Sequence, residues 1–414
     1  MVVPPEGAHE DSSKRGGGGE RGYDRAVTHL PVIVSKRGES RVRSGHPWIF
    51  RSDVAHASGA PAGAVVRVLG PTGRPLGFAF FSDRSEIQLR MIERGETLAP
   101  TFLHDRLRAA RAWRETIAPG VEALRIVHGE GDLLPSLVVD RYGEYLVVQT
   151  LSQATDGRKA EIVAALVEIF RPRGILERND PRVRALEGLP SQVGAVHGEV
   201  PETVTVSENG VRFEADLWRG QKTGLFLDQR ENHAMAREYA RGRVLDGFTY
   251  NGGFGLTVAA KAEEVVAVDV SADAVARVQR NAALNGITNV TAREANVFDL
   301  LHDLDGRGER FDTVILDPPA FAKSKSAASK ARRGYKEINL RALKILSPGG
   351  CLVTCSCSYH VHEADLEGIL ADAAADAGAT VSVIEKRRQA RDHPILLGVP
   401  ETYYLKCFVL RKLA

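Results

Sequence analysis

Between residues 30 and 96 the chain carries short apolar runs that are separated by glycine, proline and serine. This spacing of short strands and turn signals is typical of a small barrel, so we predict a small β-barrel that ends near Glu96. The domain is placed at residues 29–99. The runs that carry the prediction read LPVIVS, AVVRVLG, GFAFF and EIQLRMI.

Residues 1–28 have no such pattern. They are polar and rich in glycine, with four glycines in a row at 16–19. A segment of this kind cannot bury enough apolar surface to offset the entropy lost on ordering, so we predict a disordered tail.

Residues 100–218 mix helical and strand patterns. Helical spacing over 101–117 predicts an apolar face made of Phe102, Leu103, Leu107, Ala110 and Trp113. A second helix is predicted at 159–170, with strands at LVVDR, EYLVVQT and ILERN. Asn209-Gly210 lies between two alternating runs, which is a strong hairpin signal. These elements predict a central α+β domain.

From Gly242 onward strands alternate with helices, which implies a doubly wound, parallel, Rossmann-like α/β sheet. The C-terminal domain is placed at residues 219–414. Its predicted strands read RVLDGF, EVVAVDVS, NVTAREAN, FDTVILD and GCLVTCSC.

Composition limits the classes of protein that fit. The 414 residues suffice for two or three domains, and 43% apolar with 26% charged residues is typical of a globular protein. No apolar run is long enough for a transmembrane helix, and the first residues lack a signal-peptide core. All four cysteines fall in the last 64 residues, which favours a reduced cytoplasm over a disulfide framework. Because the net charge is only +2, any nucleic-acid binding must depend on local clusters.

A glycine-rich segment, DGFTYNGGFG at 246–255, follows the first C-terminal strand. Such a turn lets a ligand approach the backbone and the start of the next helix. It matches neither the GxGxxG turn of dinucleotide sites nor the phosphate loop of triphosphate sites. Asp269 ends the next strand, where a carboxylate can accept both hydroxyls of a ribose. Turn and acid together favour S-adenosylmethionine; a plain tight turn with Asp269 as a helix N-cap is the structural alternative.

Asp317 ends the fourth strand and is followed by two prolines, Ala320 and Phe321. The prolines fix the backbone and stop the strand, so the Asp317 carboxylate is held rigidly at the sheet edge. A rigid acceptor there can hydrogen-bond a nucleobase, on which Phe321 can stack. A purely structural turn explains the same motif.

The fifth strand runs into Cys355 and Cys357, which alternation places on one face near Asp317. A thiolate there can attack C6 of a pyrimidine. Since the pKa of a free cysteine is about 8.5, we expect nearby basic side chains to lower the pKa of the nucleophile. Cys351 and Cys407 lie inside apolar strands and are interpreted as core residues.

Two histidines follow these cysteines in the pattern CxCxxHxH, residues 355–362. The spacing matches neither the cysteine pairs nor the histidine pairs of structural zinc sites. No metal is therefore predicted.

Two basic clusters lie at 36–51 and 322–336. The first interleaves basic residues with Trp48 and Phe50, as RNA contact on a small barrel requires. The second contains no acid and follows the strand-end acid Asp317, where it can form a phosphate-binding flap. Ordinary solvated surface explains either cluster alone, but together with the strand-end site they favour a polynucleotide. The candidate RNA-binding residues are Lys36, Arg37, Arg41, Arg43, Lys323, Lys325, Arg332 and Arg333.

The chain after residue 30 resembles the RlmI-like family of 23S ribosomal RNA (cytosine-C5) methyltransferases, which combine a PUA domain with a class I catalytic domain. GHPWIF is similar to the signature of the PUA domain, and GEGDLLPSLVVDRYG (129–143) to the central domain. GQKTGLFLDQREN (220–232) is similar to the segment that leads into the catalytic domain. The motifs YNGGFG, VVAVDVS, ILDPPAF, RGYKEIN, TCSCS and DHP (392–394) then follow in family order.

The resemblance implies roles for matching positions. Cys357 would be the nucleophile, with Cys355 at a position where the pattern varies, and Asp317 would contact both the methionine end of the cofactor and the target base. LFLDQREN would close over the cofactor. Two positions depart from the family: Asn296 stands where an acid is frequent, and His233 where an arginine is usual. The implied cofactor-binding residues are Asp246, Tyr250, Asn251, Gly252, Gly253, Asp269, Asn296, Val297, Asp317, Gln229 and Arg230.

The implied reaction is covalent. The target cytosine is flipped out or single-stranded, Cys357 adds to C6, and C5 then takes the methyl group of S-adenosylmethionine. The expected partner is 23S ribosomal RNA in the cytoplasm, with no membrane contact; a homodimer is left open.

Three other functions compete with this prediction. A guanine-modifying, base-nitrogen methyltransferase shares the acid–proline–proline motif but needs no cysteine. A non-catalytic RNA-binding or ribosome-assembly factor would keep the fold without the chemistry and would not bind the cofactor. A dehydrogenase fits least, because the GxGxxG turn is absent.

Overall fold

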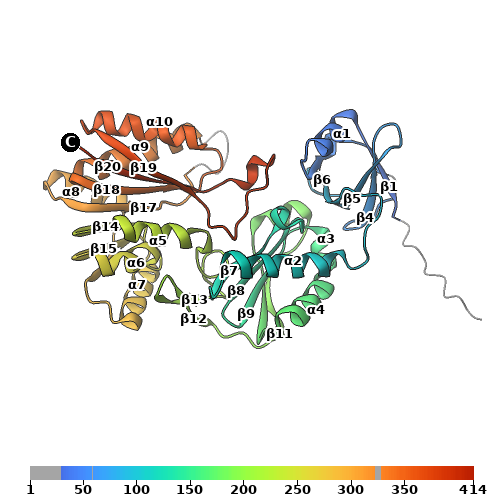
Figure 1. Ribbon diagram of the computed structural model, residues 1–414, viewed down its shortest axis with the longest axis horizontal. Helices are drawn as coiled ribbons and strands as arrows, with labels where there is room; N and C mark the ends of the chain where they lie inside the picture. The colour runs from blue at the N-terminus through green and yellow to red at the C-terminus, as the bar shows by residue number, and fades with distance from the viewer. Residues whose placement is uncertain (1–28, 58, 322–327) are drawn as a thin grey trace, which may run out of the picture.

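The structure is a computed structural model that describes residues 29–57, 59–321 and 328–414, and the tail predicted to be disordered lies outside these ranges. Within these ranges its strands form four sheets, of which three have five or more strands. In Figure 1 the N-terminal strands lie at the right of the view, the central sheet at the lower middle and the C-terminal sheet at the left.

The N-terminal part is a six-stranded sheet in the order β2-β6-β5-β4-β1-β3, and all four predicted runs lie in its strands. Its interior is apolar, and Val34, Ile49 and Val66 are fully buried. The first basic cluster begins with a helix, α1 (Lys36–Arg43). The Ser35 side chain caps this helix by accepting a hydrogen bond from the Gly38 N–H. The strands are β1 (Pro31–Val34), β2 (Trp48–Phe50), β3 (Val54–His56), β4 (Val65–Leu69), β5 (Pro75–Phe81) and β6 (Ile87–Glu93).

The central part is a five-stranded sheet, ordered β11-β10-β9-β8-β7, with helices packed against it, followed by a separate hairpin. The predicted hairpin turn is confirmed, since both Asn209 and Gly210 have positive φ. The elements are α2 (Phe102–Ile117), β7 (Ala123–His128), β8 (Leu137–Tyr142), β9 (Tyr145–Thr150), α3 (Gln153–Gly157), α4 (Lys159–Phe170), β10 (Gly174–Asn179), β11 (Gln192–Gly198), β12 (Thr203–Glu208) and β13 (Val211–Asp216).

The predicted apolar face of α2 is wrong at one position. Trp113 is 54% exposed, and the next residue, Arg114, is buried in its place. Arg114 donates to the Asp132 carboxylate at 2.7 Å and to the backbone carbonyl of Asp392 at 2.9 Å. A buried ion pair therefore takes the core position, and it connects the central part to the C-terminal part.

The C-terminal part is a seven-stranded sheet in the order β16-β15-β14-β17-β18-β20-β19. Its strands are β14 (Arg243–Gly247), β15 (Glu264–Asp269), β16 (Val290–Glu294), β17 (Phe311–Leu316), β18 (Leu346–Ser356), β19 (Val381–Arg388) and β20 (Lys406–Lys412). Its helices are α5 (Arg230–Tyr239), α6 (Gly253–Val258), α7 (Ala272–Asn285), α8 (Val297–Gly306), α9 (Ala328–Ile345) and α10 (Glu363–Asp376).

Helices cover both faces of this sheet, as predicted for a doubly wound fold (Figure 1). Residues of α8, α9 and α10 share one apolar cluster with the sheet, and residues of α5 and α6 share another. The prediction of a parallel sheet is wrong at one strand, because β20 runs antiparallel to both β18 and β19. An apolar run such as CFVL carries no signal of direction, which is decided by the preceding connection. Within the described ranges, no helix is long and apolar enough to cross a membrane.

Candidate active site

The glycine-rich segment forms a tight turn between β14 and α6. Tyr250 and Gly252 both have positive φ, and α6 begins at Gly253. The Asp246 carboxylate stabilises the turn, since its Oδ2 accepts hydrogen bonds from the Thr249 hydroxyl at 2.5 Å and from the Gly255 N–H at 2.9 Å. Burial raises the pKa of Asp246 to about 7.

The glycines of this turn are required by packing inside the protein. A Cβ on Gly253 would lie 2.6 Å from the His233 ring, and a Cβ on Gly255 would lie 2.8 Å from Asp246. His233 itself is buried, with Nδ1 2.6 Å from a Glu208 carboxylate oxygen. The sequence prediction explained these glycines by the approach of a ligand. The structure shows that protein side chains, those of His233 and Asp246, leave no room for a Cβ at Gly253 and Gly255.

Asp269 lies at the carboxyl end of β15, as predicted, and holds the turn from the neighbouring strand. Its Oδ2 accepts from the Tyr250 N–H and its Oδ1 from the Ser271 N–H, both at 3.0 Å. The N-cap of α7 is Ser271 and not Asp269, so the structural alternative for this acid does not hold. The half-exposed carboxylate can still accept from hydroxyl groups outside.

Asn296 and Val297 follow the end of β16, one strand further along the sheet. Asn296 caps α8 by accepting from the Phe298 N–H at 2.9 Å, and Val297 is buried. Sequence reasoning missed Phe298, whose ring lies 6.3 Å from that of Phe248 and 5.7 Å from that of Phe321. These rings supply an apolar wall beside the strand ends.

Asp317 follows β17, next to the glycine turn, and its N–H donates to the Gly247 carbonyl at 3.4 Å. Burial raises the pKa of this carboxyl group to about 6, against the opposing effect of His233. Its carboxylate also accepts a hydrogen bond from Gln229. A carboxyl group with a pKa near neutrality can both give and take a proton, so Asp317 suits acid–base chemistry.

Cys357 follows β18 directly, beside Asp317, and its Sγ donates to the Pro318 carbonyl at 3.9 Å. Burial, together with the Asp317 carboxylate, raises the pKa of the Cys357 thiol to about 11, while Lys222 opposes the change. The expectation that the surroundings lower this pKa is therefore wrong for the free protein, because a carboxylate disfavours a second negative charge beside it.

Cys355 is fully buried within β18, opposite Cys407 of β20. Both thiols belong to an apolar cluster with Val353, and burial raises the pKa of Cys355 well above its usual value. The partly exposed Cys357 is therefore the cysteine that a ligand at the strand ends can reach.

Sequence reasoning missed Lys406, which lies opposite Ser356 in β20. Its buried ammonium donates to the carbonyls of Ser358 at 2.8 Å and Tyr404 at 3.0 Å. Burial lowers the pKa of Lys406 to about 8, and the charge of Cys357 acts in the opposite direction. The sequence alone does not reveal this buried cation near the nucleophile, because it does not show that β20 lies beside β18.

The segment LFLDQREN divides between two environments. Gln229 is buried, and its side chain donates a hydrogen bond to the Asp317 carboxylate. Arg230, predicted to bind the cofactor, instead forms a buried ion pair with Asp392 at 2.8 Å and donates to the Ala123 carbonyl at 3.3 Å. The structure thus places Arg230 at the contact between the central and C-terminal parts.

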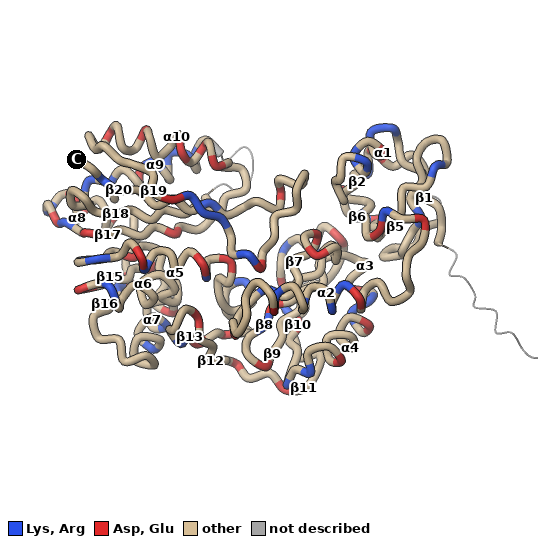
Figure 2. Tube along the Cα trace, viewed as in Figure 1, with Lys and Arg blue, Asp and Glu red and all other residues tan. Residues whose placement is uncertain are grey.

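The first basic cluster is largely paired with acids. Asp53 forms ion pairs with Arg37 and with Arg41, the latter at 3.7 Å, and Arg43 donates to Glu39. Lys36 is exposed on the same helix, where Figure 2 shows basic positions gathered. The cluster therefore presents less free positive charge than its composition indicates.

The second basic cluster is described only in part. Lys323 and Lys325 lie outside the described residues. Arg332 and Arg333 lie on α9, where Arg332 pairs with Asp365 at 3.2 Å and Arg333 is exposed. This portion of the cluster is a helix face. No group of metal-ligating side chains occurs among the residues that the structure describes.

Comparison with known proteins gives two matches along the chain. Residues 188–406 match the family described as S-adenosylmethionine-dependent methyltransferase, and residues 32–94 match a PUA-like domain. The ribosomal RNA large subunit methyltransferase I of Tolumonas auensis is 40% identical over 92% of this chain and 98% of that protein. The enzyme of the same name from Shewanella amazonensis is 42% identical over 88% and 95%.

Solved structures show the same fold. A SAM-dependent methyltransferase structure from Streptococcus mutans has a TM-score of 0.78 at 20% identity, and covers 92% of this chain and 100% of that chain. A methyltransferase complexed with SAH has a TM-score of 0.80 at 20% identity and the same coverage. The predicted PUA-like and doubly wound methyltransferase folds are confirmed, as is the predicted use of S-adenosylmethionine.

Proposed function

The chain belongs to the S-adenosylmethionine-dependent methyltransferase family that includes the ribosomal RNA large subunit methyltransferases I, and we propose that it forms 5-methylcytosine in 23S ribosomal RNA. The observation that carries the cytosine-C5 assignment is that the Cys357 thiol and the Asp317 carboxylate lie near each other at adjacent strand ends. A base-nitrogen methyltransferase needs no thiol there.

The residues around the glycine turn fit the cofactor. The Asp269 carboxylate is half-exposed at a strand end, which suits the two ribose hydroxyls. Asp246 Oδ1 is buried and has no hydrogen-bond partner in the described part of the chain, so it can accept from a cationic amino group. We assign Tyr250 and Asn251–Gly253 to the methionine part, and Val297 with Asn296 to the adenine side.

S-adenosylmethionine supplies the electrophilic methyl group. The protein supplies the nucleophile and the proton transfers. Sγ of Cys357 forms a bond to C6 of cytosine, and Asp317 passes the thiol proton to N3, so that the carboxyl group ends the addition in its initial state. The electron pair of the C5–C6 double bond is then available at C5 for the methyl group. A base, which can be water, then takes the C5 proton, the C5–C6 double bond forms again, and the C6–Sγ bond breaks to release the thiolate. The proton on N3 returns to this thiolate, so the enzyme regains its thiol.

The pKa values suit this order of events. The Asp317 carboxylate, whose pKa is about 6, can take up the thiol proton and pass it to N3 of the bound base, and while it is neutral it no longer disfavours the thiolate. The nucleophile is therefore activated by the bound base rather than in the free enzyme.

We assign recognition of the RNA to residues 29–99 and catalysis to residues 219–414. The PUA-like match over 32–94 and the named activity of the relatives support this division. A ribosomal RNA substrate and four free cysteines support action in the cytoplasm.

The test is methyl transfer from labelled S-adenosylmethionine to unmodified 23S ribosomal RNA, with the modified nucleoside identified by mass spectrometry. Wild type is expected to give 5-methylcytidine and Cys357→Ala to give none. Label that survives the substitution, or that appears on a purine, would contradict the nucleophile. Absence of label from both, in a protein that binds SAH, would favour a non-catalytic RNA-binding factor.

A further inference from the structure

A cavity of about 520 Å³ lies between the central sheet and the loop that precedes α5. Arg125, Gln149 and Arg178 line it from the central strands, and His393 and Tyr404 line it from the C-terminal part. The loop residues 219–222 complete the wall. Its volume is in the usual range for small-ligand sites, and it is distinct from the glycine turn.

Most of the charged residues that line this cavity are basic. Arg125, Arg178, Arg219 and Lys222 line it, and of the described residues Asp180 is the one carboxylate that does. The carboxylates of Asp140 and Asp228, which pair with Arg125 and Lys222, are buried behind the lining. The cavity therefore presents cationic groups to its contents.

Two of these cations are held rigidly. Arg178 donates to the carbonyls of Leu217 at 2.6 Å and Gly220 at 3.1 Å, in addition to its pair with Asp180. Arg125 forms a bidentate pair with Asp140, at 2.8 and 2.9 Å. Groups that are already ordered lose little conformational entropy when an anion binds.

The cavity lies close to the reacting thiol. Lys222 and Tyr404 line the cavity, and both donate to the Asp228 carboxylate, at 2.6 and 2.8 Å. The charges of Lys222 and Asp228 also act on Cys357, so these two residues lie near the nucleophile as well as at the cavity. Lys406 donates to the Tyr404 carbonyl from the same side.

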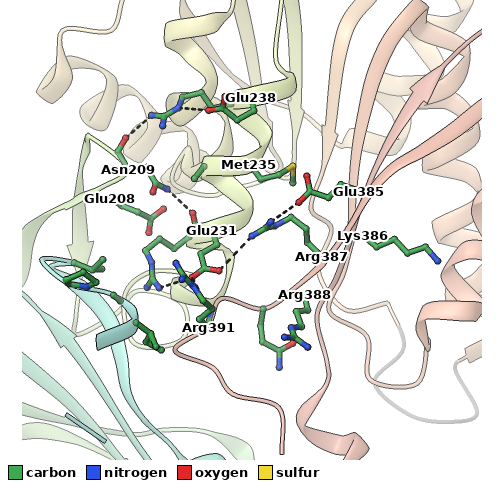
Figure 3. A pocket seen from close by; sticks show the side chains of 18 of the residues that line it. Glu208, Asn209, Glu231, Met235, Glu238, Glu385, Lys386, Arg387, Arg388 and Arg391 are labelled. Atoms are coloured by element: carbon green, nitrogen blue, oxygen red, sulfur yellow. Dashed lines mark hydrogen bonds and ion pairs between the residues drawn. The ribbon is translucent and has the colours of Figure 1, made fainter. Parts of the chain in front are cut away.

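A larger cavity of about 1550 Å³, between α5, β19 and the loop after α2, offers a contrast (Figure 3). Six basic and six acidic residues are among the described residues that line it. Figure 3 shows several of them paired with one another, for example Arg391 with Glu231 and Arg387 with Glu385, both at 2.8 Å. A lining with equal numbers of acidic and basic side chains does not favour a polyanion. The smaller cavity, whose charged lining is mostly basic, is therefore the candidate binding site for RNA phosphates.

We propose that the 520 Å³ cavity binds the phosphodiester backbone of the RNA strand beside the target cytosine, with Arg219 and Lys222 as its phosphate contacts. The inference rests on the proposed function for the identity of the strand. A phosphate in this cavity would hold the neighbouring nucleotide against the wall of the active site, so the base beside it is delivered to Cys357.

Arg219 offers a test with a matched control. Its side chain is 74% exposed and pairs with the similarly exposed Glu202 at 3.0 Å, so its removal should leave the fold unchanged. Arg173 is an arginine of the same kind, 66% exposed and paired with Glu144 at 3.3 Å, but it does not line the cavity. The variants are Arg219→Gln and Arg173→Gln.

The probe is unmodified 23S ribosomal RNA, and the readout is its dissociation constant as a function of salt, in the presence of SAH. Arg219→Gln should weaken binding about 3- to 10-fold near 0.1 M salt, and the slope of log Kd against log salt should fall by about one. Arg173→Gln should change neither. Equal behaviour of the two variants would overturn the proposal.

A third variant should change the affinity for RNA in the opposite direction. Asp180→Asn removes the lining carboxylate, while Arg178 keeps its two carbonyl partners, so RNA should bind more tightly. Weaker binding in a variant with an unchanged unfolding midpoint would count against the cavity. Cytidine 5′-monophosphate is the second probe: if it displaces the RNA at micromolar concentration, the cavity is a free-nucleotide site and the strand assignment fails.

These binding measurements do not depend on which nucleoside the enzyme produces. If Arg219→Gln weakens RNA binding but the wild type yields no 5-methylcytidine, the cavity is supported and the proposed function fails. If 5-methylcytidine forms but Arg219→Gln binds like Arg173→Gln, the proposed function is supported and the cavity fails.

Discussion

Asp317 and Cys357 follow the paired strands β17 and β18, and the Cys357 thiol donates to the carbonyl of Pro318, the residue after Asp317. Burial and the Asp317 carboxylate together raise the pKa of the thiol to about 11. In the free protein the nucleophile is therefore kept protonated, which protects it from oxidation and alkylation.

Asp317→Asn should make the Cys357 thiol more reactive while it abolishes methyl transfer. Removal of the carboxylate charge lowers the pKa of the thiol, and a fall of one unit raises the thiolate fraction at pH 8 about tenfold. The rate of alkylation by iodoacetamide, followed by mass spectrometry of the peptide that contains Cys357, measures this effect. Cys357→Ala gives the background. An unchanged rate in Asp317→Asn would show that the carboxylate does not control the thiol.

Asp246 gives a prediction about stability and pH. Its pKa is about 7 in the folded protein and about 3.9 when unfolded, so the folded state binds more protons between these values. The free energy of unfolding should therefore fall as the pH rises from about 4 to 7. Asp246→Asn should remove this dependence and be more stable than wild type at pH 8, by roughly 4 kcal/mol, while it binds SAH more weakly.

Urea unfolding at pH 5 and pH 8 measures the difference. The exposed Asp299→Asn is the control, since it changes the same charge without touching the turn. A parallel fall of stability with pH in Asp246→Asn and Asp299→Asn would mean that Asp246 is not the group responsible.

Much of the site could be predicted because strand ends are visible in the sequence. Asp269 and Asp317 each close an apolar run, and the carboxyl ends of parallel strands meet at one sheet edge. The same pattern placed both Cys355 and Cys357 at that edge. The family resemblance favoured Cys357 as the nucleophile, and the structure supplies the physical reason, because β18 is covered on both faces and Cys355 is fully buried.

Other features depend on contacts between distant segments. Arg114 is buried because it meets the carbonyl of Asp392, 278 positions further along the chain. Lys406 comes to the nucleophile because β20 inserts antiparallel beside β18. Local periodicity carries no information about either contact, so Trp113 was placed in the core and Lys406 was overlooked.

Arg230→Met should destabilise the fold instead of weakening the cofactor site. Arg230 and Asp392 form a buried pair at 2.8 Å, and removal of one partner leaves an uncompensated buried charge, at a cost of about 3 to 5 kcal/mol. Arg391→Met is the control, because Arg391 is exposed and its pair with Glu231 should be worth less than about 1 kcal/mol. Urea unfolding gives the stability, and SAH titration of the folded protein should give an unchanged Kd. A weaker SAH Kd at unchanged stability would restore Arg230 to the cofactor site.

The cysteine assignment can be tested by trapping the adduct. In RNA made with 5-fluorocytidine, the fluorine on C5 cannot leave as a proton does, so the bond between C6 and the nucleophile should persist. With S-adenosylmethionine present, wild type and Cys355→Ala should both form a protein–RNA complex that survives denaturing electrophoresis, and Cys357→Ala should form none. Cys355→Ala should lose only about 1 kcal/mol of stability, since it removes one buried heavy atom. A persistent complex with Cys357→Ala that disappears with Cys355→Ala would move the nucleophile into the strand, and would require β18 to open when RNA binds.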